Sequence, residues 1–293
     1  MNYRFIFIAG LVLQAVLLAG SAATTLASDL PPWLRQASTA STPSYEKDVP
    51  AVVLYNEHQV SITSDGTLVS VENYAVKLLN NDGRNFAIAR ALYLVSSGKV
   101  RDISGWLIRP DGSFKEYEKK SVLDMISDPD DVYNEYRLKI IDASKEVDTG
   151  FVFGYTVTTE EPPLFYQDDW RFQNRLPTLD SRYSLTLPAG WKASSITFNA
   201  PEVKPQINGT NYLWEMRNLP PIPPEPMSPA VVNLSPRVVI NYQPPDASQS
   251  ANRSFADWRD VSKWASSLYD PQVIVDDEVA AKARELSKCA DRA

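Results

Sequence analysis

The stretch that decides the fold is AVVLYNEHQVSITSDGTLVSVENYAVKLL, residues 51–79. In its first half apolar and polar residues alternate: Val52, Leu54, Val60 and Ile62 share one parity of position, and Glu57, Gln59, Ser61 and Thr63 share the other. Alternation with a period of two places one face of a strand on a core and the other face in water. Ser64-Asp65-Gly66 then marks a tight turn, because glycine adopts a positive φ at little cost. The stretch therefore predicts an antiparallel hairpin with one buried face.

The same pattern continues beyond the hairpin. Further turn signals stand at Asn81-Asp82-Gly83, Ser96-Ser97-Gly98 and Pro110-Asp111-Gly112, and they separate strand-like runs up to residue 117. More β-rich runs follow up to residue 242, interrupted by the proline-rich stretch 220–226. Regular short strands with turn signals favour an antiparallel meander that begins a sandwich or barrel. We predict a mainly β fold, with an antiparallel β-sandwich-like domain over residues 51–245.

Residues 254–293 change to a helical period. Ser254 and Asp257 have the spacing of a helix N-cap and its reciprocal partner. Apolar residues then recur at helical spacing, namely Phe255, Trp258, Val261, Ala265 and Leu268. Asp270-Pro271 ends that helix, and Asp276-Asp277 can begin another. The sequence predicts a short helical tail after the β domain.

Residues 1–27 have the pattern of a secretory signal peptide: Arg4, an apolar run over 5–18 and small residues ending at Ala27. We expect cleavage after Ala27, with an uncleaved membrane anchor as the alternative. Residues 28–50 are rich in proline, serine and threonine and predict a flexible lead-in. A single cysteine, Cys289, allows no intrachain disulfide, which favours a bacterial envelope over a eukaryotic secreted setting. We expect an exported, periplasmic or cell-envelope protein.

Composition argues against several functional classes. Hydrophobic residues make up 44% of the chain, which excludes wholesale disorder. A net charge of −7 without a basic run argues against a nucleic-acid partner. After the signal, no stretch of the sequence is long and apolar enough to span a bilayer. The sequence also has no phosphate-binding loop, dinucleotide fingerprint or zinc-ligand spacing, so we expect neither cofactor nor metal.

Few residues are candidates for catalysis. His58 is the only histidine, and its neighbours in sequence include no nucleophile. A cysteine nucleophile needs a base and a group that orients the base, so we expect no catalytic pair between His58 and Cys289. The carboxylates gather at Asp168-Asp169 and at Asp128, Asp130 and Asp131. The second cluster lacks the glycine and distal glutamate of a calcium loop and is better explained as a solvated turn. We assign no catalytic residue.

Aromatic residues are the remaining binding candidates. Tryptophan and tyrosine exposed on a sheet can stack on sugars or on a partner, whereas buried ones fill a core. We name Trp170 and Trp191 as possible binding aromatics, with core packing as the alternative for both.

Five segments carry a family resemblance. They are LIRPDG (107–112), GYTV (154–157) before Pro162, WRFQ (170–173), LTLPAGW (185–191) and FADWRDVSKW (255–264). In this order and spacing the chain resembles the bacterial domain of unknown function 3857 over most of its length after the signal. In that family the β domain stands ahead of a transglutaminase-like domain with papain-type Cys, His and Asp residues.

The resemblance implies an accessory role. The chain ends about where the second domain would begin, so we expect residues 254–293 to be the truncated start of a transglutaminase-like region and the chain not to be an enzyme. We expect a non-catalytic exported accessory or binding module, whose partner is a transglutaminase-like domain or another envelope protein. The alternatives are a carbohydrate- or peptidoglycan-binding β module, or a fragment of a transglutaminase-like enzyme whose catalytic domain is missing.

Overall fold

The computed structural model describes residues 29–131, 133–163, 165–245, 255, 257–273 and 276–290. The predicted signal peptide, residues 1–27, lies outside this part of the chain. Among the described residues, no helix is both long and apolar enough to cross a bilayer.

An eight-stranded sheet, called sheet A, is the base of the fold. From one edge to the other it contains β12 (Gln206–Asn208), β13 (Asn211–Leu219), β10 (Thr178–Thr186), β1 (Ala51–Ile62), β2 (Leu68–Leu78), β8 (Val152–Glu161), β4 (Lys99–Ile108) and β5 (Phe114–Tyr117). Neighbouring strands are antiparallel except β1 and β10, which run parallel.

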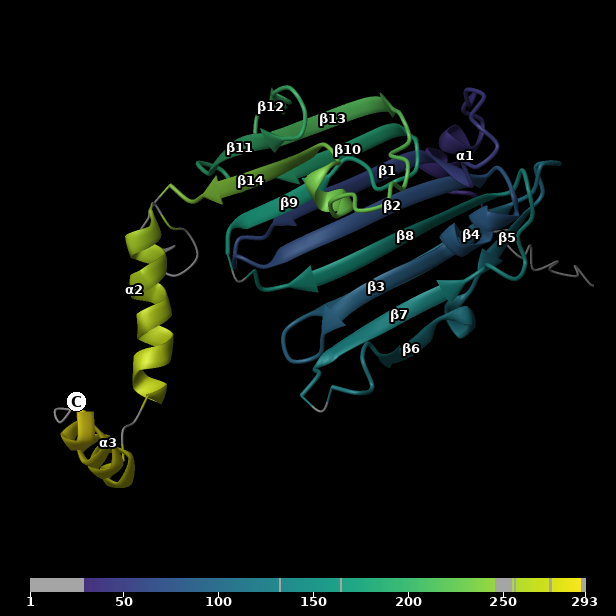
Figure 1. The fold of residues 1–293 in the computed structure, drawn as a ribbon. Helices are drawn as coiled ribbons and strands as arrows, with labels where there is room; N and C mark the ends of the chain where they lie inside the picture. The colour runs from purple at the N-terminus through teal and green to yellow at the C-terminus, as the bar shows by residue number, and fades with distance from the viewer. Residues whose placement is uncertain are drawn as a thin grey trace, which may run out of the picture.

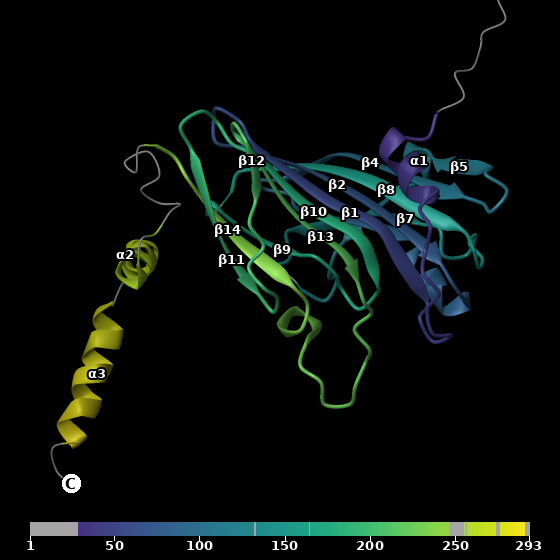
Figure 2. The ribbon, with the colours of Figure 1, turned by 90° about the horizontal axis from the view of Figure 1, so that it is seen from above.

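Two three-stranded sheets cover one face of sheet A (Figures 1 and 2). Sheet B contains β3 (Ile88–Leu94), β7 (Tyr136–Asp142) and β6 (Leu123–Ile126), and sheet C contains β11 (Lys192–Phe198), β14 (Arg237–Gln243) and β9 (Gln167–Arg171). Each encloses its own core against sheet A: Phe153 and Ile141 belong to the core under sheet B, and Trp214, Tyr183 and Tyr242 to the core under sheet C. The predicted mainly β, sandwich-like class is confirmed.

The first hairpin pairs as predicted, but not with a single buried face, and the meander does not continue. A β-bulge between Val53 and Tyr55 places Val52 and Leu54 in a core on one face of sheet A, whereas Val60 and Ile62 belong to the core under sheet C on the other face. β1 and β2 pair antiparallel, and Gly66 in their turn has a φ of 82°. The next strand, β3, leaves sheet A for sheet B, because residues 81–86 form the 3-10 helix η1 (Asn81–Phe86) instead of a hairpin turn. Gly83 is needed there for close packing, since a Cβ would lie 2.4 Å from the Pro50 carbonyl oxygen. The meander prediction is therefore wrong after β2.

The flexible lead-in predicted for residues 28–50 is corrected as well. Residues 32–38 form helix α1 (Pro32–Ser38), with Pro32 at its first turn, where the missing N–H costs no hydrogen bond. Leu34 is fully buried against Gly154 of β8, on the face of sheet A opposite sheets B and C. Proline thus begins a docked helix here and does not mark a mobile segment (Figure 2).

Two helices follow the β domain, α2 (Trp258–Tyr269) and α3 (Asp277–Ala290), joined through the 3-10 helix η5 (Asp270–Gln272). The predicted N-cap Ser254 lies outside the described residues, and the observed N-cap is Asp257, whose carboxylate accepts the N–H groups of Arg259 and Asp260. The short 3-10 helices η2 (Lys119–Ser121) and η3 (Val231–Asn233) lie in loops of the β domain.

Candidate functional site

A cleft of about 570 Å³ lies between sheets B and C, with sheet A as its floor. The floor comes from β1, β2, β8 and β10, one wall from the η1–β3 segment and the other from β9 and the residues after it. Its polar and aromatic lining includes Asn56, His58, Glu72, Tyr74, Asn85, Arg90, Tyr155, Asp168, Asp169, Trp170, Arg171, Gln173 and Asn174.

His58 is the centre of one polar group in the cleft. Parallel pairing sets His58 of β1 beside Tyr183 of β10, and the alternation of β9 turns Asp168 and Trp170 toward them. The imidazole stacks on Trp170 with ring centroids 5.5 Å apart, and its Nε2 lies 3.9 Å from Asp168 Oδ2. The Tyr183 hydroxyl donates to the same carboxylate oxygen at 2.7 Å. Burial first, and the Asp168 charge second, raise the pKa of Tyr183 well above its ordinary value.

A second carboxylate on the floor is held in the same way. The Tyr155 hydroxyl of β8 donates to Glu72 Oε1 of β2 at 2.6 Å. Burial, and then the Glu72 charge, raise the pKa of Tyr155 well above its ordinary value. Tyr74 stacks on Tyr155 with ring centroids 5.3 Å apart. Glu72 on the floor and Asp168 on the wall therefore each already accept a hydrogen bond from a buried tyrosine.

The two arginines of the lining differ from the carboxylates. Arg90 on β3 and Arg171 on β9 are exposed, and within the described part of the chain neither guanidinium makes a hydrogen bond or ion pair. Arg90 acts at longer range on Asp142, whose pKa is lowered mainly by its hydrogen bonds to Ser144 and to a smaller extent by Arg90. By contrast, Asp169 on β9 forms an ion pair with Arg237, whose Nη1 lies 2.9 Å from Asp169 Oδ2. The cleft therefore contains two guanidinium groups whose N–H donors have no partner within the described part of the chain.

The two predicted binding aromatics lie in different places. Trp170 is half-buried and lines the cleft. Trp191 is half-buried outside it, edge-on to Tyr166 with ring centroids 4.9 Å apart. Both tryptophans also pack on the core under sheet C. The structure therefore separates Trp170, as a cleft residue, from Trp191.

The other chemical candidates stay apart from the cleft. Asp128 and Asp131 accept backbone N–H groups within an exposed turn. Among the described residues, no group of three histidine, cysteine or carboxylate side chains is arranged to hold a metal ion. Cys289 belongs to α3, and its side chain is not among those described.

Sequence reasoning found Trp170 but missed most of its neighbours. The missed lining residues are Glu72, Tyr74, Arg90, Tyr155 and Arg171. His58 and Asp168 were considered separately and meet only because β9 folds over the floor of the cleft. The alternation of β1 and β2 does indicate that His58 and Glu72 each lie on one definite face, but it does not show which strands face them.

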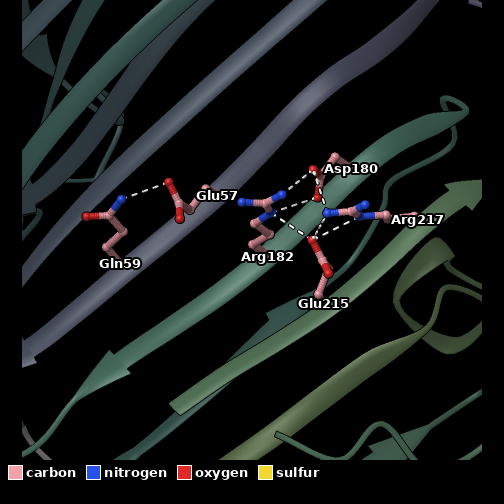
Figure 3. Close-up of polar contacts among 6 residues, drawn as sticks. All are labelled: Glu57, Gln59, Asp180, Arg182, Glu215 and Arg217. Atoms are coloured by element: carbon pink, nitrogen blue, oxygen red, sulfur yellow. Dashed lines mark hydrogen bonds and ion pairs between the residues drawn. The ribbon is translucent and has the colours of Figure 1, made fainter. Parts of the chain in front are cut away.

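The opposite face of sheet A carries a separate charge network (Figure 3). Arg182 of β10 forms ion pairs with Asp180 at 2.7 Å and Glu215 at 2.9 Å, and Arg217 of β13 pairs with Glu215 at 2.7 Å. Two arginines thus face two carboxylates, all within reach of one another. Because these charges are balanced within the chain, the network stabilises the neighbouring strands β10 and β13 and offers no unmatched group to a ligand.

A family model decides the relationship of this chain to known proteins. The model of domain of unknown function 3857 (DUF3857), a family with solved structures, matches residues 64–223, more than half of the chain. The chain belongs to the DUF3857 family. The matched range includes every strand of sheet A except β1, and it includes both walls of the cleft.

Solved structures agree with this at the level of the fold. A Parabacteroides distasonis protein named "putative protease" is similar to this DUF3857 chain with a TM-score of 0.57 and 15% identity, over 65% of this chain and 40% of that one. The chain therefore spans less than half of that protein's length. Yeast leukotriene A4 hydrolase gives a TM-score of only 0.34 at 12% identity, over 73% of this chain and 33% of the hydrolase. No curated protein matches the chain.

Proposed function

We propose that this chain is a non-catalytic, exported binding module that acts beside a transglutaminase-like or protease-like partner domain. The observation that carries the proposal is the cleft between sheets B and C, which combines aromatic walls, held carboxylates and unpaired arginines. A concave site with a few convergent polar groups is where a ligand is expected on an uncharacterised protein.

The chemistry of the lining favours binding over catalysis. His58 and Asp168 could serve as a base and its orienting carboxylate, but the described lining contains neither cysteine nor serine to act as nucleophile. The hydroxyl of Thr178 is directed to the Leu176 carbonyl oxygen, to which it donates at 3.3 Å. The carboxylates of Glu72 and Asp168 accept hydrogen bonds from buried tyrosines, which fixes their orientation.

The partner is inferred from the resemblance of the sequence and from the similar solved structure. That Parabacteroides protein is more than twice as long as the matched region and is named a protease as a whole. A non-catalytic β domain with a polar cleft would present a ligand to such a catalytic neighbour, or would dock another envelope protein. The pattern of residues 1–27, which is typical of a secretory signal, supports the exported part of the proposal.

The two candidate tryptophans provide a matched test. Soluble peptide and glycan fragments of digested cell walls should bind the full mature chain in isothermal titration calorimetry, a measurement that does not need a tryptophan as reporter. Trp170→Ala should weaken this binding by at least about tenfold, or about 1.4 kcal/mol. Trp191→Ala should leave it unchanged, because Trp191 lies outside the cleft.

The same protein should show no hydrolysis or transamidation of generic peptide substrates, and Cys289→Ser should change nothing. Turnover that is lost with Cys289→Ser or His58→Ala would refute the non-catalytic assignment. Equal effects of the two tryptophan substitutions would refute the cleft as the binding site.

Carbohydrate binding is the second candidate, and the position of Trp170 favours it. An indole in a cleft with the side-chain amides of Asn56, Asn85 and Asn174 resembles the polar and aromatic lining that sugars require. A glycan array with the wild-type chain and Trp170→Ala would test this role, and binding that depends on Trp170 would support it.

A further inference from the structure

Two free strand edges border the cleft. β3 is the outermost strand of sheet B, β9 is the outermost strand of sheet C, and both contribute lining residues. Within the described chain, each pairs with only one neighbour, β3 with β7 and β9 with β14. Figure 1 shows β9 and β3 on either side of β2 and β8, which belong to the floor. The cleft is thus a slot between two unpaired edges.

An unpaired edge has a definite ligand chemistry. Its outward N–H and C=O groups form a ready template for another extended chain, which adds at a spacing of about 4.8 Å. This β-strand addition is a recurrent mode of peptide recognition, in which the main chain gives affinity and side-chain contacts give specificity. The cleft volume of about 570 Å³ falls within the range of roughly 300–1,000 Å³ typical of ligand sites.

Charge distinguishes the two edges. β9 carries Asp168 and Asp169, whereas β3, with the sequence IARALYL, carries Arg90 and no carboxylate. Arg171 adds a second cation without an ion-pair partner among the described residues, on the facing wall. A guanidinium binds carboxylate groups in a bidentate manner, so two unmatched arginines favour an anionic ligand. An acidic strand would be attracted to Arg90 of β3 and to Arg171 at the end of β9, and repelled by Asp168 of β9.

We propose that the cleft binds an acidic peptide in extended conformation, which adds as a strand to the free edge of β3 and places its carboxylates on Arg90 and Arg171. This inference rests on the proposed function, because it names the ligand class of the same cleft. The opposite wall, with Trp170 stacked on His58, then packs against side chains of the bound strand.

The probe for this proposal is a fluorescein-labelled octapeptide of alternating valine and glutamate. Its valine–glutamine analogue is the charge control, and a version N-methylated on alternate residues is the backbone control. Fluorescence anisotropy with the full mature chain should give a Kd at least about tenfold lower for the glutamate peptide than for the glutamine peptide.

Variants assign that preference to residues. Arg90→Gln with Arg171→Gln should abolish the preference for glutamate, since both guanidinium groups are then lost. Arg217→Gln is the matched control, because Arg217 lies on the opposite face of sheet A (Figure 3) and should leave the preference intact. N-methylation should weaken binding by at least about tenfold, and bound peptide should slow amide hydrogen exchange in β3 but not in the distant strand β12.

Each other outcome overturns the proposal. Equal affinity for the glutamate and glutamine peptides removes the role of the arginines, and equal affinity for the N-methylated peptide removes strand addition. No peptide binding up to about 1 mM, together with glycan binding that Trp170→Ala abolishes, would refute the peptide but keep the cleft as a binding site. No binding of either class would refute the proposed function too.

Discussion

Two buried tyrosines hold two carboxylates of the cleft in place through hydrogen bonds. Tyr155 and Tyr183 are buried and donate to Glu72 and Asp168, and burial and these charges raise the pKa of both hydroxyls. In the unfolded chain a tyrosine ionises near pH 10. Because the folded pKa is the higher one, the unfolded state loses protons first, so this contribution to stability is complete below about pH 10 and is lost as pH rises above it.

Tyr155→Phe should therefore lower the free energy of unfolding at pH 7 by about 2 kcal/mol, since the half-buried Glu72 carboxylate loses its donor. The destabilisation of wild type between pH 9 and about 11 should also be smaller in this variant. Urea unfolding across this range measures both effects. Tyr133→Phe is the control, because Tyr133 is 92% exposed, and it should match wild type at every pH. A stability of wild type that does not change above pH 10 would contradict the assignment.

At the scale of elements, Leu34 anchors α1 to sheet A, together with the buried Ala37 and the stacking of Trp33 on Tyr55. Leu34 is fully buried, and a Cβ on Gly154 would lie 2.4 Å from Leu34 Cδ1. Leu34→Ala should cost about 2–4 kcal/mol by leaving a cavity, and Gly154→Ala about 1–3 kcal/mol by overpacking. In the double variant the new methyl group enters the space that Leu34 vacates, so the combined loss should be smaller than the sum by about 1 kcal/mol or more.

Denaturant unfolding of the four proteins measures this coupling between α1 and β8. Losses that add within about 0.5 kcal/mol would mean that helix and strand are independent. Protease cleavage within residues 39–50 should be faster in the variants that lose more stability, because this segment is tethered by α1 on one side and β1 on the other.

Strands and helices could be predicted from the sequence where their formation depends only on neighbouring residues. The β1–β2 hairpin follows from alternation and Gly66, and α3 begins as expected at Asp276, whose side chain accepts the Val279 N–H. Trp33-Leu34 is an apolar pair that could dock, but its docking position was not predictable, because it depends on a gap above Gly154 that only the assembled sheet creates. The departure of β3 from sheet A was not predictable for a similar reason. Gly83 packs closely against the Pro50 carbonyl, and residues 81–83 alone do not reveal this contact because Pro50 is distant in sequence.

At the scale of the whole molecule, the cleft exists because three sheets meet. His58 and Asp168 approach within 3.9 Å although they belong to different sheets and lie far apart in sequence. The parallel pairing of β1 with β10 and the folding of β9 over them create this contact, and neither follows from alternation. Trp170 was identifiable as an aromatic candidate, but its distinction from Trp191 required the topology. The sequence therefore predicts the class of fold, whereas the site depends on strand order.

The whole molecule also has to reach the compartment where its ligand lies. Arg4, the apolar run and Ala27 predict export with cleavage, so N-terminal sequencing of the protein from a bacterial envelope fraction should begin near Ser28. Leu13→Arg interrupts the apolar run and should leave an uncleaved product in the cytosol. Ser41→Arg adds the same charge at an exposed position after the signal and should be exported normally. An uncleaved wild-type chain retained in the membrane would identify residues 1–27 as an anchor, and an uncleaved wild-type chain in the cytosol would refute export and, with it, an envelope peptide as the ligand of the cleft.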